Sequence, residues 1–90
     1  MTLYWSKESI KQFEKIYDYI AKHFGAEKSE EFYNEFLQKV EHIKKFPLAG
    51  KISENNILVR EIIFLRNTLY YKILNAQEIL IVTIRHRKDS

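Results

Sequence analysis

The sequence predicts one α+β domain, in which an antiparallel sheet carries an N-terminal helical hairpin on one face. Three observations support this prediction. The chain has 90 residues, which is enough for a single domain spanning 1–90. Apolar residues recur at helical spacing between Ser6 and Pro47. From Ile57 onward they fall in short runs rich in β-branched and aromatic side chains, which is typical of strands. The expected order of elements is β-α-α-β-β-β.

The N-terminal elements follow from caps and breakers. Residues 2–5 (Thr-Leu-Tyr-Trp) are short, apolar and aromatic, and they predict a first strand. Ser6 is a suitable N-cap for a helix that continues to Gly25. A second helix is expected over 26–46, because proline disfavours helical geometry in the residue before it. A turn of one or two residues between the helices makes them an antiparallel αα-hairpin.

Three further strands are expected over residues 57–64, 68–74 and 79–86, and a short polar link joins the last two into a hairpin. Strand alternation would place the last strand's residues in two sets. The sets are Leu80, Val82, Ile84 and His86 on one face, and Ile79, Ile81, Thr83 and Arg85 on the other. Both sets are largely apolar, so we expect this strand to be central and covered on both sides for most of its length.

Composition excludes several classes of site. The chain has no cysteine, so it has no disulfide, thiolate zinc site or thiol nucleophile. No further ligand stands at metal spacing from His23 or His42, and we predict neither a metal nor a cofactor. Gly25 and Gly50 are too isolated to form a phosphate-binding loop. Because no signal peptide or long apolar run is visible, we expect a cytoplasmic protein without membrane contact.

The positive charge is concentrated in the last third of the chain. Residues 1–59 hold nine lysines and nine acidic residues, whereas residues 60–90 hold six basic and three acidic residues, which accounts for the net charge of +3. The arginines all belong to the second group, and they are Arg60, Arg66, Arg85 and Arg87. Since the guanidinium fork suits bidentate contact with phosphate, this distribution favours a polyanionic partner.

Several segments together resemble a known family. Residues 46–51 (Phe-Pro-Leu-Ala-Gly-Lys) resemble a proline–glycine corner, 59–61 (Val-Arg-Glu) a strand motif, 69–71 (Leu-Tyr-Tyr) an aromatic strand, and 86–89 (His-Arg-Lys-Asp) a terminal motif. In this order they are similar to the RelE/ParE superfamily of toxins from bacterial type II toxin–antitoxin systems. The resemblance implies a growth-inhibiting toxin in a hetero-oligomer with a cognate antitoxin, whose partly disordered segment wraps the hairpin and sheet.

The resemblance leaves the target open. The terminal motif is similar to the RelE side, whose members cleave messenger RNA on the ribosome, although that side usually continues to a catalytic tyrosine and here Ser90 follows. The corner and Arg60-Glu61 are more similar to the ParE side, whose members inhibit DNA gyrase. Our first prediction is ribosome-dependent mRNA cleavage by a metal-independent endoribonuclease. The alternatives are a gyrase inhibitor and a degenerate relative that binds only its antitoxin.

RNA cleavage by 2′-hydroxyl attack needs proton transfer and cationic stabilisation of the phosphorane. His86 is the candidate acid or base, because histidine exchanges protons near neutral pH. Arg60 and Arg85 are the candidate phosphate-stabilising residues, and the mechanism requires them to converge with His86 in one pocket. Candidate substrate-binding residues are Lys51, Arg66, Tyr71 and Arg87.

Structural roles compete with these assignments. His86 at a strand end can simply be solvated or hydrogen-bonded within the fold. Arg60 can be the partner of a helix-surface acid such as Glu35 or Glu41. Of the pair Tyr70-Tyr71, one ring would then belong to the core and the other to the surface.

Overall fold

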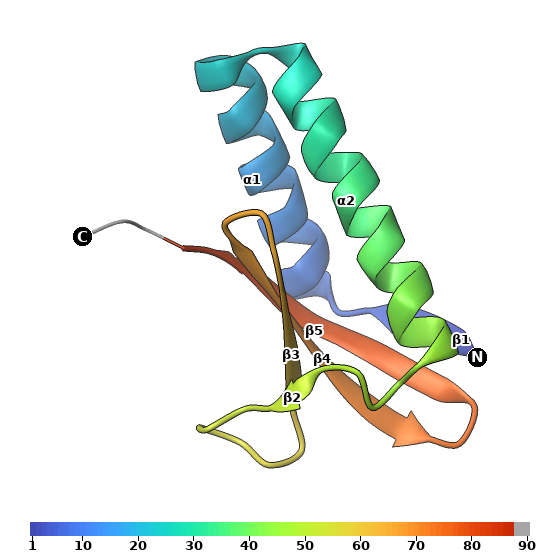
Figure 1. Cartoon of the computed structure of the whole chain (residues 1–90). Coiled ribbons are helices and arrows are strands. Elements are labelled where there is room, and N and C mark those ends of the chain that lie inside the picture. The colour runs from blue at the N-terminus through green and yellow to red at the C-terminus, as the bar shows by residue number, and fades with distance from the viewer. Residues whose placement is uncertain (88–90) are drawn as a thin grey trace.

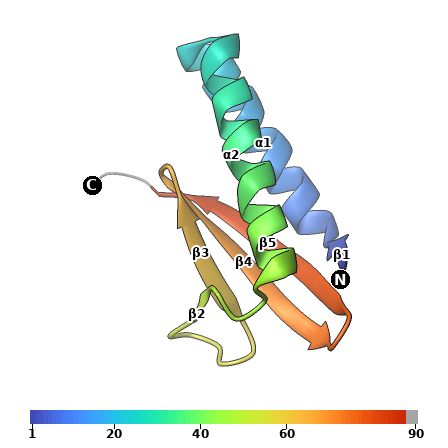
Figure 2. The same cartoon turned by 45° about the vertical axis from the view of Figure 1, so that its right-hand side comes forward.

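The computed structural model describes residues 1–87, in which two long helices pack against a five-stranded sheet (Figure 1). The elements are β1 (Thr2–Trp5), α1 (Lys7–Phe24), α2 (Ala26–Lys45), β2 (Lys51–Ile52), β3 (Arg60–Phe64), β4 (Asn67–Asn75) and β5 (Glu78–His86). The predicted α+β class and helical hairpin are confirmed. Both views show the end of the hairpin where α1 turns into α2 extending past the sheet (Figure 2).

The sheet order is β1-β5-β4-β3-β2, and it differs from the prediction in two details. β1 runs parallel to β5, whereas the other pairs are antiparallel. Parallel pairing is possible because the rest of the chain, both helices included, forms the long connection it needs. The second difference is the short strand β2, which was not predicted. Residues 53–59 follow it as a loop, which is closed by a 2.8 Å hydrogen bond from Ser53 N to Val59 O.

Ser6 and Gly25 delimit α1, as predicted. The Ser6 Oγ accepts a hydrogen bond from Ser9 N (2.9 Å), which satisfies one of the free N–H groups at the helix start. The same hydroxyl donates to the Val82 carbonyl on β5 (2.6 Å), and this bond fixes the helix start to the centre of the sheet. Gly25 has φ of +93°, a left-handed conformation that glycine adopts without the penalty of a Cβ.

A β-bulge at Val82 changes the alternation of β5. Tyr70 pairs with Thr83 while Tyr71 pairs with Ile81, so that Val82 is an extra residue. Before the bulge, the residues at 79 and 81 face the helices; beyond it, those at 84 and 86 do. The predicted division of this strand into two sets is therefore wrong beyond Val82, because a one-residue insertion reverses the facing of all later side chains. Its central position is confirmed, between β1 and β4.

The core lies between the helices and one face of the sheet. Its fully buried residues are Phe32, Phe36, Ile43, Leu69, Tyr71, Ile79, Ile81 and Ile84. Aromatic contacts join the layers, with ring centroids 4.9 Å apart for Trp5 and Phe36 and 5.7 Å apart for Phe32 and Phe64. The opposite face of the sheet has no helix on it within residues 1–87, and we call it the open face. Neither α1 nor α2 has the combination of length and apolar character that crossing a bilayer requires.

Candidate functional site

The arginines lie at separate places on the sheet. Arg60 is on the side that faces the helices, at the end of β3 near α2, whereas Arg85 projects from the open face. Arg66 lies in the two-residue turn between β3 and β4, and Arg87 directly follows β5. Arg66, Arg85 and Arg87 all lie near the end of β5, while Arg60 is remote from them.

Arg60 stabilises the corner between α2 and β2. Its Nη1 donates to the carbonyl oxygens of Gly50 (2.7 Å) and Leu48 (3.4 Å). Beside it, the Tyr71 hydroxyl donates to the Pro47 carbonyl (2.7 Å) and accepts from Gly50 N (2.9 Å). Arg60 thus has the kind of structural role that competes with catalysis, although its partners are backbone carbonyls and not the helix carboxylates considered as the alternative.

Tyr71 belongs to the core, and its predicted substrate-binding role is wrong. Its side chain is fully buried, and both hydrogen-bonding functions of its hydroxyl are used by the corner. Burial raises the pKa of Tyr71, while the Gly50 N–H and the charge of Arg60 act in the opposite direction. The hydroxyl therefore stays protonated, which it must be to donate to Pro47. Tyr70 is the surface member of the pair.

Arg60 and His86 are both on the helix-facing side, but at opposite ends of it. Arg60 pairs with Tyr71 and His86 pairs with Asn67, four residues away along β4. With about 3.3 Å per residue and about 4.8 Å per strand, Arg60 and His86 are separated by roughly 16 Å. Buried side chains such as Leu69 fill the space between them.

Arg85 is on the other face of the sheet. Its guanidinium carbon lies 5.9 Å from the ring centroid of Tyr70, a cation–π arrangement. Lys51 is also on this face, where its Nζ lies 3.5 Å from Glu61 Oε1. The expectation that Arg60, Arg85 and His86 converge is therefore wrong, since no single phosphate can contact all three. Alternation in the sequence places Arg85 and His86 on opposite faces, as observed, but which of the two faces the helices depends on the bulge at Val82.

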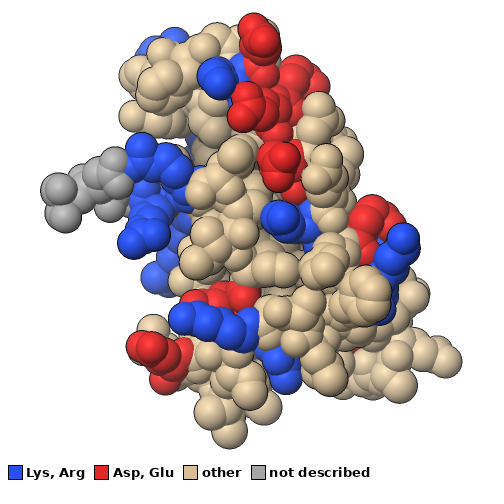
Figure 3. Space-filling view, in the orientation of Figure 1, with Lys and Arg blue, Asp and Glu red and all other residues tan. Residues whose placement is uncertain are grey.

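A second cluster forms where β5 ends beside α1. The His86 Nδ1 lies 3.1 Å from Asn67 Oδ1, and the Asn67 side chain is buried. The ring centroid of Tyr19 on α1 is 6.4 Å from that of His86. A pocket of about 620 Å³, which we call the β5-end pocket, is lined by Lys15, Ile16, Tyr19, Phe24, Arg66, His86 and Arg87. Figure 3 shows Lys and Arg side chains gathered at this end of the molecule.

Lys15, Tyr19, Phe24 and Asn67 were absent from the sequence-predicted site. The sequence does contain a signal for Tyr19. This aromatic residue falls outside the core-facing apolar stripe of its helix, so its ring is expected at the surface. Asn67 has no such signal, since its partner is on another strand. The residues Lys88 and Asp89 of the terminal motif lie outside the described residues.

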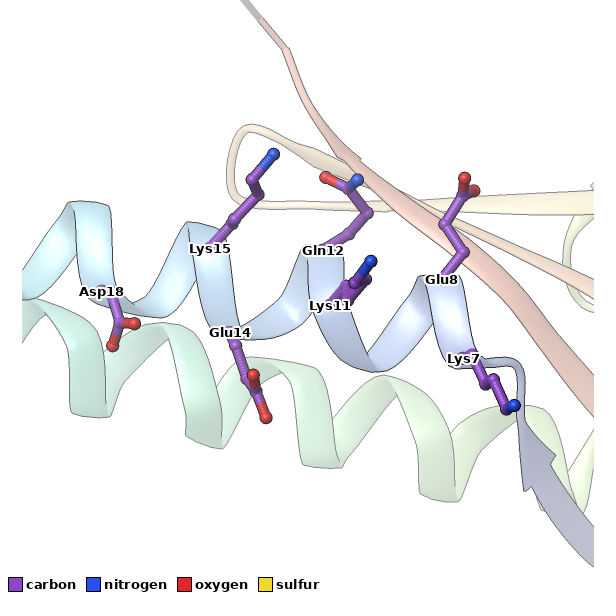
Figure 4. Close-up of a pocket in the computed structure, with 7 residues that line it drawn as sticks. All are labelled: Lys7, Glu8, Lys11, Gln12, Glu14, Lys15 and Asp18. Carbon is purple, nitrogen blue, oxygen red and sulfur yellow. The ribbon is translucent and has the colours of Figure 1, made fainter.

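A second hollow, of similar size, runs along the outer surface of α1 and has a different character. It is lined by Lys7, Glu8, Lys11, Gln12, Glu14, Lys15 and Asp18. Figure 4 shows these side chains projecting in different directions from the helix and not toward a common point. Mixed charges on an exposed helix surface are typical of a solvated face, and we assign no site there. Within residues 1–87, no three histidine or carboxylate side chains are grouped so that they could hold a metal ion.

Comparison with known proteins identifies the family. Residues 3–90 match the family described as ParE toxin of type II toxin–antitoxin system, parDE. The chain belongs to the ParE toxin family. A solved structure described as "Chromosomal ParDE TA system from P. aeruginosa" has the same fold, with a TM-score of 0.81, 22% sequence identity, and coverage of 98% of this chain and 97% of that chain. No curated protein matches the chain.

The family match confirms the resemblance to RelE/ParE toxins that the sequence motifs indicated. A toxin of a type II toxin–antitoxin system has a cognate antitoxin as its partner. The molecular target is a separate question, which depends on the surface of this chain.

Proposed function

We propose that this ParE-family toxin inhibits growth by acting on DNA gyrase and does not cleave mRNA on the ribosome. The observation that carries the proposal is the match to the ParE family over residues 3–90. It favours the gyrase alternative over the nuclease prediction, because the ParE side of the superfamily is the one that resembles gyrase inhibitors.

The site geometry supports the same choice. General acid–base cleavage needs a proton-transfer group and a phosphate-stabilising cation within hydrogen-bond reach of one substrate. Arg60 is bonded to the corner carbonyls and is roughly 16 Å from His86, while Arg85 is on the open face. Induced movement of Arg60 toward a substrate would also break the bonds that hold the corner.

Exposed apolar side chains support a protein target. Ile57 is 81% exposed and Leu58 is 68% exposed, at the tip of the loop between β2 and β3. The Asn56 Oδ1 accepts from Leu58 N (2.9 Å), and the Asn56 main-chain carbonyl accepts from Val59 N (3.0 Å), so these bonds hold the main chain of the loop that carries the two side chains. Adjacent exposed apolar residues rimmed by polar ones are typical of protein–protein contact.

The cognate antitoxin requires its own surface. A groove of about 460 Å³ on α2 is lined in part by Leu37, His42 and Phe46, and it suits helix-in-groove docking. β1 and β2 are the edge strands of the sheet and suit strand addition. An acidic antitoxin segment over the basic end of β5 would give a complex that weakens as salt increases.

Induction of the toxin in growing bacteria tests the proposal. We expect gyrase-cut DNA and a DNA-damage response, with transcripts left intact. Codon-linked RNA 5′ ends that vanish in His86→Ala and Arg60→Ala variants would instead establish the nuclease. Normal growth, together with antitoxin binding by the purified chain, would show that the chain is a degenerate relative that binds only its antitoxin.

A further inference from the structure

We propose that the β5-end pocket binds a nucleotide unit of a single-stranded nucleic acid, with the base on an aromatic ring and the phosphate at Arg87 and Lys15. This binding is a property of the isolated chain and does not depend on gyrase inhibition. Three features support the proposal: the positive charge of the lining, the rigidity of the backbone segments that bear the arginines, and the exposure of the aromatic rings.

The lysine and arginine side chains of the lining carry its charge. Lys15, Arg66 and Arg87 come from α1, the β3–β4 turn and the end of β5, and no Asp or Glu is among the described lining residues. Three formal positive charges around one concavity attract an anion and lower the free energy of its binding. Guanidinium groups present two parallel N–H donors, which match the oxygens of a phosphate.

The main chain that bears Arg66 and Arg87 is held by hydrogen bonds. The main-chain N–H of Arg87 donates to the Arg66 carbonyl (2.6 Å), which ties the end of β5 to the β3–β4 turn. His86 is bonded to Asn67, which is only 2% exposed. Because its partner in this bond is an amide oxygen, the His86 Nδ1 is the donor. A binding site on such a frame loses little conformational entropy when a ligand arrives.

The aromatic rings of the pocket are open to solvent. Tyr19 is 50% exposed and Phe24 is 64% exposed, unlike the aromatic residues of the core. The Tyr19 ring lies 6.3 Å from that of Phe24 and 6.4 Å from that of His86, with interplanar angles of 64° and 47°. The His23 ring is nearer, 4.3 Å from the Tyr19 ring at 48°, and none of these three neighbouring rings is stacked parallel on it. Such rings act as stacking surfaces for bases of any sequence.

A nucleotide matches both halves of this chemistry, because it joins a flat ring to a phosphate. An acidic peptide supplies the charge but need not supply a ring to stack, and a duplex keeps its bases stacked inside the helix. The pocket volume of about 620 Å³ falls within the range of roughly 300–1,000 Å³ that small-ligand sites occupy. We therefore infer a single strand as the ligand.

Fluorescence anisotropy of a labelled thymidine octanucleotide with the full-length chain tests this inference. Tyr19→Ala should weaken binding by roughly five- to 100-fold, the usual effect of removing a stacking ring. Arg87→Gln should weaken binding and lower the slope of log K against log salt by about 0.7, the value for one phosphate contact on a single strand. Thermal melts should show that both variants are folded.

Matched variants and ligands separate this site from nonspecific attraction. Tyr33→Ala removes an exposed ring on α2, and Lys7→Gln removes one charge about 12 Å further along α1 from Lys15; both should bind like the parent chain. Equal losses in these controls would overturn the site. Tighter binding of a duplex of the same sequence, or of a polyglutamate peptide, would also overturn it, the latter in favour of an acidic protein partner.

Discussion

Replacing Tyr71 with phenylalanine tests the role of the corner between α2 and β2. The change removes one oxygen atom, yet it leaves the Gly50 N–H and the Pro47 carbonyl without their partner. Each unsatisfied buried group costs about 1–3 kcal/mol, and we expect the variant to lose about 2–4 kcal/mol of unfolding free energy. That is a large share of the roughly 5–13 kcal/mol available to a chain of this size.

Urea unfolding, followed by circular dichroism, measures this loss. The midpoint should fall while the m value is unchanged, and the melting temperature should drop by roughly 10–25 °C. Tyr70→Phe is the matched control, because its ring is on the open face, and its stability should stay within about 0.5 kcal/mol of the parent. A Tyr71→Phe variant as stable as Tyr70→Phe would refute the argument that these two bonds hold the corner.

Three other changes have defined outcomes. Gly50→Ala would place a Cβ 2.7 Å from the Tyr71 hydroxyl oxygen and 2.9 Å from a backbone carbonyl oxygen, and calorimetry should show a loss of about 1–3 kcal/mol or more. Arg60→Gln should lose about 1–2 kcal/mol of stability, while gyrase inhibition per folded molecule stays within roughly twofold of the parent. The hydrogen bond from the Tyr4 hydroxyl lowers the pKa of Glu78, so its stabilisation is full above pH 4.5 and is lost as the pH falls through the lower folded value. Tyr4→Phe should therefore flatten the acid limb of a stability–pH curve, and an unchanged limb would contradict this.

The helical half of the fold was predictable because its signals are local. Ser6 caps α1, Gly25 ends it, and the apolar period is visible in any window of the helices. Apart from β2, which was not predicted, the strands were located to within about three residues by their β-branched and aromatic content. Their pairing was harder, because the bulge at Val82 depends on contacts with β4 and with Ser6, which the sequence of β5 alone does not reveal.

The site was only partly predictable for the same reason. Of the arginines concentrated in the last third of the chain, Arg66, Arg85 and Arg87 lie near the end of β5. The sequence did not separate Arg60 from the others, since its carbonyl partners lie 10 and 12 residues away across a corner. Tyr19 lines the same pocket from α1. It is far from Arg66, His86 and Arg87 in the sequence, so no sequence motif links it to them.

A supercoiling assay with purified gyrase, relaxed plasmid and ATP is the decisive test of the proposed target. The purified toxin should block supercoiling, and linear, gyrase-cut plasmid should accumulate when the enzyme is denatured. In a translating extract the same toxin should leave mRNA intact. Full supercoiling at saturating toxin, together with mRNA cleavage that requires His86, would contradict the proposed target.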